Sequence, residues 1–376
     1  MSATKPLAES LLVNPLRRAD APIGASDDAP RRFHQTMPGY APSPLLNAPV
    51  TAKAIGAERV LVKRETERFD LPAFKIIGAS WATARALHDL LIERGLAAPD
   101  LDLGFAALIE AVEPLKPMTL CCATDGNHGR AVARMAKWLG FSSRIFVPSD
   151  MAPARIAAIE SEGAEVIPLD GTYDDAIARS AQEMSADCLV ISDTSWPGYS
   201  EIPQWVIDGY GTMFVEADEQ LAGAKVDVVA IQLGVGALGA ATIPFARRHG
   251  ATLIGVEPIA AACNFVSLEA GEIVNLPGPH DSIMAGLNCG LASEIAWPVV
   301  SGNLDLAIAV EDRRAEEAIR LLARDGIVAG ETGAAGLAGL ISWTEEFGGD
   351  LAGKTVFIVT TEGPTDPAAW ERIIAS

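Results

Sequence analysis

The sequence has 376 residues, 49% hydrophobic and 21% charged, which excludes an intrinsically disordered chain and leaves room for more than one core. Acidic residues outnumber basic ones 49 to 29, and the net charge of -20 disfavours nucleic acid as a partner. From the opening residues and the longest apolar runs we expect no secretory leader and no segment of the roughly 20 apolar residues that cross a bilayer. Five cysteines without CxxC spacing indicate a reducing compartment. We therefore expect a cytoplasmic globular protein with no membrane partner and no metal site.

The first 45 or so residues are rich in Pro, Ala, Arg and Asp, and we expect them to form an extended arm. Beyond them, short β-type runs alternate with helix-type runs. The predicted strands are 59–65, 119–124, 143–149, 164–170, 188–193, 226–233, 251–258, 304–310 and 355–361. The predicted helices include 129–140, 153–163, 173–186, 315–326 and 334–347.

Near-continuous apolar strands separated by helices predict mostly parallel sheets covered on both faces, because parallel strands need long crossover connections. The fold class is therefore α/β. The polar and aromatic segment 193–213 interrupts the alternation, and we interpret it as the boundary between two open sheets. We expect an arm and the first part of a large domain in residues 1–75, a small α/β domain in 76–219, and the rest of the large domain in 220–376.

A glycine-rich turn, "LGVGALGAA", lies between a predicted strand and a helix, with glycines at 234, 236 and 239. Backbone N–H groups in such a turn and at the helix start can receive a phosphate. A tight turn with close helix packing explains the glycines about equally well. A dehydrogenase that binds NAD is disfavoured, because the turn lies past the middle of the chain and Glu257 is only a rough match for a ribose-binding acid.

The stretch "ATDGNHGR" follows another predicted strand, and a helix can begin near Asn127. The free N–H groups of its first turn can receive a carboxylate. Thr124, Asp125, Asn127 and His128 would then lie beside that anion. Helix capping by Asp125 or Asn127 explains one of these polar residues but not all four.

Lys75 stands between Phe74 and the apolar run "IIGA". A lysine near a helix start is usually a surface residue, but apolar neighbours lower the pKa of an amine and favour a Schiff base. A phosphate loop, a carboxylate loop and such a lysine together suggest pyridoxal phosphate acting on a small amino-acid substrate.

The motifs that carry a family resemblance are "FHQTMPGYAPSPLL", "KRETERFDLPAFKIIGAS", "ATDGNHGRAVA", "DTSWPGYSEIPQWVIDGYGTM", "MAGLNCG", "GETGAAG" and "TEGPTDP". The chain resembles the fold-type II pyridoxal-phosphate enzymes, which are tryptophan synthase beta-like, and within them the diaminopropionate ammonia-lyases. Asp125 in "TDGNHGR" is the most specific mark, because related dehydratases usually have a small residue there. The resemblance implies an active site between the two domains and a homodimer.

The resemblance also implies roles for individual residues. Lys75 would form the internal aldimine, Asn127 would bind the phenolic oxygen of the cofactor, and Thr360, favoured over Thr361, would face the pyridine nitrogen. The cofactor phosphate would be held by Gly234, Val235, Gly236, Ala237, Leu238 and Gly239. The residues expected to bind the substrate are Thr124, Asp125, Gly126 and His128.

The implied reaction is an α,β-elimination of 2,3-diaminopropionate through an external aldimine and aminoacrylate, which hydrolyses to pyruvate and a second ammonia. Lys75 is the expected base for the L-isomer, and Asp125 is the candidate base for the D-isomer. Asp193 matches a position near the substrate amine, although a turn residue at a strand end is an equally good interpretation.

Two departures from the family pattern concern the substrate. Pro364 stands where the family usually has Asp, and Pro72 where Asn is common. Glu331 either approaches the cofactor ring or caps its helix. The alternative function is a serine, threonine or 3-hydroxyaspartate dehydratase with the same cofactor. A non-catalytic binding protein is disfavoured by Lys75 and Asn127.

Overall fold

The computed structural model describes residues 6, 8–24, 27–124, 126–171 and 173–376. The chain divides into two compact units. Unit 1 comprises Met1–Ser26, Pro42–Glu67 and Met213–Ser376, and unit 2 comprises Asp27–Ala41 and Arg68–Thr212. This division differs from the predicted domain limits over residues 27–41, 68–75 and 213–219, and those limits remain a prediction.

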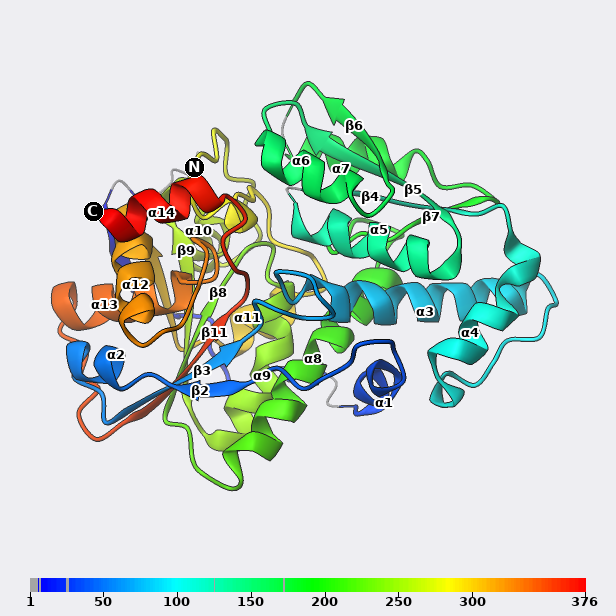
Figure 1. The fold of residues 1–376 in the computed structure, drawn as a ribbon. Helices are drawn as coiled ribbons and strands as arrows, with labels where there is room; N and C mark the ends of the chain where they lie inside the picture. The colour runs from blue at the N-terminus through cyan, green and yellow to red at the C-terminus, as the bar shows by residue number, and fades with distance from the viewer. Residues whose placement is uncertain (1–5, 7, 25–26, 125, 172) are drawn as a thin grey trace. The chain divides into compact units, whose positions relative to one another are not determined.

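Unit 1 is built on a seven-stranded sheet (Figure 1). Its strands, in spatial order, are β1 (Ser10–Val13), β10 (Leu306–Val310), β9 (Thr252–Pro258), β8 (Val228–Gln232), β11 (Thr355–Thr360), β3 (Arg59–Arg64) and β2 (Leu45–Asn47). The two edge strands pair antiparallel and the five inner strands are parallel. All of β8 is buried, as expected for a central parallel strand covered on both faces.

The helices of unit 1 cover both faces of this sheet. They are α2 (Pro49–Ala54), the second part of α8 (Glu201–Leu221), α9 (Ala237–His249), α10 (Cys263–Ala270), α11 (Trp297–Asn303), α12 (Asp312–Arg324), α13 (Ala335–Glu346) and α14 (Pro367–Ala375), with short 3-10 turns at Ile259–Ala261 and Ala285–Leu287. Val228 and Ala230 of β8 pack in one core with residues of α12 and α13. Val229 and Ile231 point to the opposite face, since side chains alternate along a strand, and they are also fully buried.

Unit 2 contains a four-stranded parallel sheet with the order β6 (Glu165–Leu169), β5 (Ser142–Pro148), β4 (Thr119–Ala123) and β7 (Cys188–Val190). Its helices are α1 (Ala29–Gln35), α3 (Lys75–Glu93), α4 (Phe105–Ala111), α5 (Asn127–Leu139), α6 (Pro153–Glu160), α7 (Tyr173–Ala181) and the first part of α8 (Glu201–Leu221), with 3-10 turns at Leu101–Leu103 and Glu113–Leu115. α5 packs on β4 and β5 and also against the long helix α3. The carboxyl ends of β4 and β7 therefore bring their loops to one edge of this sheet.

The nine predicted strands and the five predicted helices are confirmed. The prediction of an extended arm is wrong in part, because β1 pairs with β10 and α1 is a helix with a proline in its first turn, where proline favours helix entry. The segment 193–213 does lie between β7 of the four-stranded sheet and β8 of the seven-stranded sheet, as predicted. The helix α8 occupies most of it. None of the helices in the described ranges combines the length and apolar character needed to cross a membrane.

Candidate active site

Lys75 is the first residue of α3 and follows a tight turn in unit 2. Phe69 and Asp70 in this turn have φ angles of 53° and 59°, which non-glycine residues rarely adopt. The turn is held because Arg68 and Leu71 exchange backbone hydrogen bonds of 2.9 and 3.0 Å, and because the guanidinium of Arg134 donates to the carbonyl of Phe69. Surrounding structure therefore holds a costly backbone conformation just before the lysine.

The ammonium of Lys75 forms an ion pair with the carboxylate of Asp193, with 2.6 Å between Nζ and Oδ2. The side chain of Lys75 is 23% exposed and that of Asp193 is 6% exposed, so water screens the pair only weakly. Lys75 Nζ also lies 5.6 Å from the centre of the Phe74 ring. Lys75 therefore has the predicted apolar neighbours and, in addition, a carboxylate as a partner. The sequence did not predict this contact, because Asp193 lies far from Lys75 along the chain.

Asp193 lies in the loop after β7, and a buried tyrosine organises this loop. The hydroxyl of Tyr199 donates to the carbonyl of Val190 at 2.6 Å and accepts from the N–H of Ser192 at 3.0 Å. The Ser192 hydroxyl in turn accepts from the N–H of Thr194. The residues on both sides of Asp193 are therefore hydrogen-bonded, which holds the backbone that carries its carboxylate. The nearby thiol of Cys122 has a raised pKa because of burial, then because of the Asp193 charge, while Lys75 opposes the rise.

The loop after β4 leads into α5, which begins at Asn127 as predicted. The hydroxyl oxygen of Thr124 accepts hydrogen bonds from the N–H groups of Gly126 and Gly129, at 2.9 and 3.0 Å. Thr124 therefore helps to cap this helix, a role that the sequence offered as an alternative explanation for Asp125 or Asn127. Asn127 is partly exposed at the helix start, and Asp125 lies outside the described residues.

His128 is buried beneath the same loop. Its Nε2 bonds the carbonyl of Ile191 at 2.7 Å, and its Nδ1 lies 3.8 Å from Asp193 Oδ2. The structure thus brings Lys75, Asp193 and His128 together at one edge of the sheet in unit 2. Substrate binding by Thr124, Gly126 and His128 remains a prediction. Thr124 and His128 already make hydrogen bonds that hold the loops after β4 and β7.

Tyr210 is a neighbour of Lys75 that the sequence analysis missed. Its ring is tilted against that of Phe74, with 4.6 Å between the centroids, and its buried hydroxyl makes no hydrogen bond of good geometry to any described residue. Burial raises the pKa of Tyr210, and the adjacent Lys75 ammonium opposes that rise. The available signal was an aromatic residue flanked by Gly209 and Gly211, within a segment that we interpreted only as a boundary.

The predicted phosphate loop lies in unit 1, between β8 and α9. Gly236 precedes the helix with a φ of 105°, and α9 has no side-chain hydrogen bond at its cap. A Cβ added to Gly239 would lie 2.6 Å from Leu233 Cδ2, and one added to Gly234 would lie 3.4 Å from a backbone oxygen. Gly234 and Gly239 therefore pack closely against neighbouring residues, as a tight turn requires, while Gly236 has no side chain with which to cap the start of α9. These residues fit the phosphate of pyridoxal phosphate.

Thr360 ends β11, which lies beside β8, so it shares the sheet edge with this loop. The Thr360 hydroxyl is buried and makes a long contact of 3.5 Å with the carbonyl of Lys63. The neighbouring Thr361 hydroxyl accepts from Gln232 at 2.9 Å. Glu331 is buried. The preference for Thr360 over Thr361 at the pyridine nitrogen, and the role of Glu331, remain predictions.

The described residues contain no group of three or more His, Cys, Asp or Glu side chains arranged to hold a metal ion. All five cysteines are buried and in the free thiol form.

Comparisons with known proteins identify the family. The pyridoxal-phosphate dependent enzyme family matches residues 36–362. The diaminopropionate ammonia-lyase of Escherichia coli K12 is 34% identical over 367 residues, which cover 92% of this chain and 90% of the relative. Two crystal structures of the Escherichia coli enzyme, with D-serine and with an aminoacrylate-PLP azomethine intermediate, superpose with TM-scores of 0.88 and 0.86, each at 31% identity and covering 99% of this chain and 98% of theirs. The chain belongs to the pyridoxal-phosphate dependent enzymes and, within them, to the family of the diaminopropionate ammonia-lyases.

Proposed function

We propose that this chain eliminates ammonia from 2,3-diaminopropionate, which with one water gives pyruvate and two molecules of ammonia. The observation that carries the proposal is the close pair of Lys75 and Asp193. It combines the amine needed to hold an aldehyde cofactor with an anion that suits a diamino substrate. The family membership supports the same reaction.

Pyridoxal phosphate, when bound, withdraws electrons from the α-carbon of the attached amino acid. The residues that we assign to hold it are Lys75 through its amine, Asn127 through its amide, the glycine-rich turn from Gly234 to Gly239, and Thr360. The turn contributes backbone N–H groups and a helix N-terminus, both of which favour an anion. Each side chain in this set can also donate a hydrogen bond or, for Lys75, act as a nucleophile.

Asp193 has a further role in binding the substrate. Diaminopropionate carries a second amine that serine and threonine lack, and a buried cation requires an anionic partner. The carboxylate of Asp193 is 6% exposed and already holds an ammonium at 2.6 Å. The substrate ammonium can therefore take the place of Lys75 on Asp193, which releases Lys75 to act as a base.

Proton transfer is assigned to two residues. Lys75 Nζ accepts the α-proton of the L-isomer once it is free of the cofactor and of Asp193. Asp125 is the candidate base for the D-isomer, on the opposite face of the substrate. The β-amino group must leave with an added proton, and an ammonium held at Asp193 already carries it.

The second candidate function is a dehydratase for serine, threonine or 3-hydroxyaspartate. The observation that favours it is Pro72, which replaces a common family asparagine three residues before Lys75. Proline has no N–H to donate, so this position cannot contact a substrate as an asparagine would. Pro364, in the loop after β11, is the other departure from the family pattern.

The first experiment is an absorbance spectrum of the purified protein before and after addition of D- or L-2,3-diaminopropionate. We expect a visible cofactor band that changes on mixing, and about two ammonia for each pyruvate. Loss of the lysine-bound band in Lys75→Ala would confirm the attachment residue. A band that persists without turnover, together with pyruvate formation from serine, would favour the dehydratase.

Two variants separate the assigned roles. Asp125→Ala should lose turnover of the D-isomer and retain that of the L-isomer. Asp193→Asn should raise the KM for diaminopropionate roughly ten- to hundredfold, because a charged hydrogen bond becomes a neutral one. Asp187→Asn is the matched control, since Asp187 precedes β7 and its side chain is 77% exposed. Equal effects of the changes at Asp193 and Asp187 would contradict the assignment.

We also propose that the protein is a cytoplasmic homodimer. The resemblance to the family supports the dimer, and five buried free thiols are in keeping with a reducing compartment. Light scattering at several protein concentrations tests the assembly. A constant mass near 39.4 kDa, that of one chain, would contradict it.

A further inference from the structure

Glu257 is a buried acid that the proposed reaction leaves without a role. It lies near the end of β9 and is 1% exposed. Within the described residues it takes part in no salt bridge, and burial raises its pKa to about 7. A buried carboxyl group without a cation is costly, so its hydrogen bonds must offset the loss of water.

Those hydrogen bonds come from the first turn of α10. Glu257 Oε1 accepts from the backbone N–H of Asn264 at 2.8 Å and from the Asn264 side chain at 3.0 Å. Its Oε2 accepts from the backbone N–H of Phe265 at 2.7 Å. Glu257, which belongs to β9, thus caps the N-terminus of α10. It also holds the side-chain amide of Asn264 in place. These contacts explain why it is not available to bind a ribose.

Asn264, 1% exposed, connects Glu257 with the phosphate loop. Its side-chain Nδ2 donates one hydrogen to Glu257 Oε1 and lies 2.7 Å from the carbonyl oxygen of Gly234, to which it donates the other. Both partners are acceptors, so only the amino end of the amide can face them. The two oxygen acceptors therefore determine which end of the Asn264 side-chain amide faces them.

Holding the carbonyl of Gly234 also sets the direction of a donor in the loop. A trans peptide is planar, with its C=O and N–H groups pointing in opposite directions, so the N–H of Val235 must point away from Asn264. The next peptide is held in the same way, because the N–H of Ser293 donates to the carbonyl of Val235 at 2.8 Å. This contact directs the N–H of Gly236 away from Ser293. Two neighbouring backbone donors are thus oriented from outside the loop.

We infer that Glu257 and Asn264 are positioning residues that preorganise the loop from Gly234 to Gly239 for the phosphate of pyridoxal phosphate. Asn264 fixes the first peptide of the loop, and Glu257 fixes Asn264. This inference rests on the proposed assignment of the loop to the phosphate. A donor aimed before binding loses no freedom when the phosphate arrives, so the relay raises the affinity for the cofactor.

The test measures cofactor binding rather than turnover. Apoprotein variants Asn264→Ala and Glu257→Gln are titrated with pyridoxal phosphate, and the phosphorus-31 resonance of the bound cofactor is recorded. We expect Asn264→Ala to weaken binding roughly tenfold, the effect of one lost hydrogen bond, and to shift the resonance. Glu257→Gln keeps the shape but turns one acceptor into a donor, and should act in the same direction.

The matched control is Asn303→Ala. Asn303 is equally buried in unit 1 and its Nδ2 also makes two hydrogen bonds to carbonyls, those of Pro22 and Val299, neither of which belongs to the loop. Thermal unfolding of each apoprotein shows how much stability the variants lose. Cofactor affinity and resonance that change in the two relay variants but not in Asn303→Ala would support the inference. Equal changes in all three would overturn it.

A loop variant separates failure of the relay from failure of the loop assignment. Gly236→Ala places a side chain at a φ of 105°, which strains the loop directly. If this variant weakens cofactor binding and Asn264→Ala does not, the relay is wrong and the loop assignment stands. If Gly236→Ala folds and binds the cofactor as the wild type does, both the loop assignment and the relay are wrong.

Discussion

Tyr210 is the residue beside Lys75 whose chemistry is least explained by packing alone. Its ring fills space against Phe74, and a phenylalanine would fill that space equally well. The hydroxyl is buried without a well-formed hydrogen bond among the described residues, an arrangement that costs about 1–3 kcal/mol. A polar group kept at such a cost beside the reactive amine indicates a role when Lys75 leaves Asp193.

Tyr210→Phe should therefore separate stability from function. We expect the free energy of unfolding of the apoprotein to stay the same or rise slightly, because no good hydrogen bond is lost. We expect kcat to fall roughly tenfold and the cofactor absorbance maximum to shift, since the hydroxyl lies beside the Lys75 amine and is the group that can hydrogen-bond to it once Lys75 leaves Asp193.

Tyr199→Phe is the contrasting control for this prediction. The Tyr199 hydroxyl makes two hydrogen bonds that hold the loop around Asp193, so its removal should cost about 1–3 kcal/mol of stability. Urea unfolding and the cofactor spectrum check both variants. Wild-type spectra and kinetics in Tyr210→Phe would show that the hydroxyl has no role.

At the scale of elements, two glycines allow α3 and α8 to approach closely within unit 2. A Cβ on Gly78 of α3 would lie 2.3 Å from Tyr210 Cε1, and one on Gly209 of α8 would lie 2.4 Å from the carbonyl oxygen of Ile77. Real side chains do not approach this closely. The contact between the two helices therefore also determines where the Tyr210 ring lies relative to the start of α3.

Gly78→Ala should destabilise the protein by about 1–3 kcal/mol and displace the Tyr210 ring, because the added methyl group overpacks the contact. Gly211→Ala is a close control, since Gly211 is in α8 and nothing lies within 4 Å of the added Cβ. That change should stabilise the helix by up to about 1 kcal/mol. Denaturant unfolding gives both values, and a destabilisation of equal size in the two variants would contradict the packing argument.

A second contact between elements depends on pH. Glu162 follows α6, and its side chain, 3% exposed, accepts from Arg130 at 3.1 Å and from Arg134 at 2.6 and 2.9 Å, both on α5. Burial alone would raise the pKa of Glu162, but the two guanidinium groups lower it below the ordinary 4.5. A lowered pKa stabilises the folded state above the unfolded value, and this stabilisation is lost as the pH falls through the folded value.

Glu162→Gln should therefore cost about 1–3 kcal/mol at pH 7 and progressively less below pH 4.5. Glu165→Gln is the control, since Glu165 pairs with Arg144 at the surface and is 63% exposed. Its replacement should change stability by under about 0.5 kcal/mol at either pH. Thermal unfolding from pH 3 to pH 7 measures both variants, and a cost for Glu162→Gln that is constant with pH would contradict the sign.

At the scale of the whole molecule, the sequence predicts whatever depends on local pattern. Nine strands, five helices and the start of α5 at Asn127 follow from apolar runs and their boundaries. The edge strands β1 and β2 were missed because four- and three-residue segments carry too little pattern to separate them from a loop. Their pairing depends on partners far along the chain.

The candidate site shows the same limit. Lys75 and Asn127 can be proposed as site residues from their neighbours in the sequence, and Asp193 only by resemblance. The ion pair of Lys75 with Asp193 joins residues 118 positions apart, and no local pattern encodes that distance. Tyr210 is a still harder case, since its place depends on the packing of two helices.

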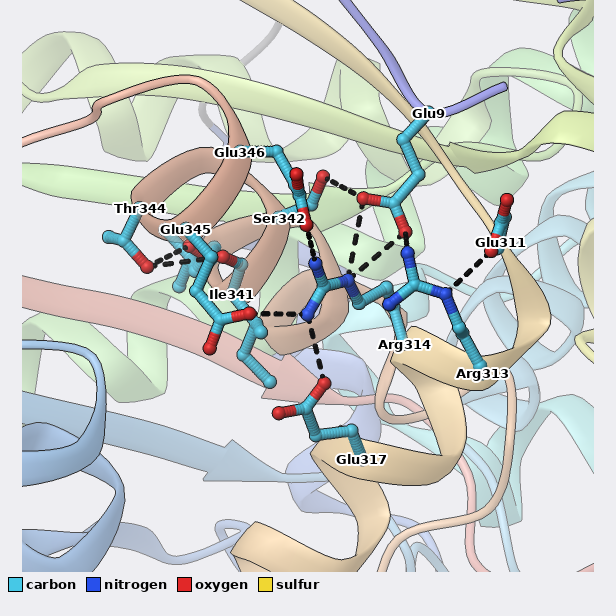
Figure 2. A network of polar contacts seen from close by, with 11 residues as sticks. Glu9, Glu311, Arg313, Arg314, Glu317, Ile341, Ser342, Thr344, Glu345 and Glu346 are labelled. Carbon is cyan, nitrogen blue, oxygen red and sulfur yellow. Dashed lines mark hydrogen bonds and ion pairs between the residues drawn. The ribbon is translucent and has the colours of Figure 1, made fainter. Parts of the chain in front are cut away.

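An arginine in α12 connects distant parts of unit 1. Figure 2 shows the guanidinium of Arg314 facing carboxylates from the N-terminal segment, from its own helix and from α13. Its hydrogen-bonded carboxylates are Glu9, Glu317, Glu345 and Glu346, at 3.0, 3.0, 2.6 and 2.5 Å. The side chains of Arg314 and Glu9 are 3% and 7% exposed, while the other three carboxylates are at least 41% exposed. The pair with Glu9 is therefore the part of the network that water screens least.

Arg314→Met should cost roughly 3 kcal/mol of stability, because it removes the main cation from the buried carboxylate of Glu9. Adding Glu9→Gln should recover part of that loss, since the uncompensated charge is then gone. Arg313→Met is the matched control: Arg313 also contacts Glu9, at 2.9 Å, but is 54% exposed, so its loss should cost under about 0.5 kcal/mol. Urea unfolding of the wild type, Arg314→Met, Glu9→Gln and the double variant gives the coupling energy, and Arg313→Met is measured beside them. Equal costs for Arg313→Met and Arg314→Met, or a double variant no more stable than Arg314→Met, would mean that burial does not determine the strength of this contact.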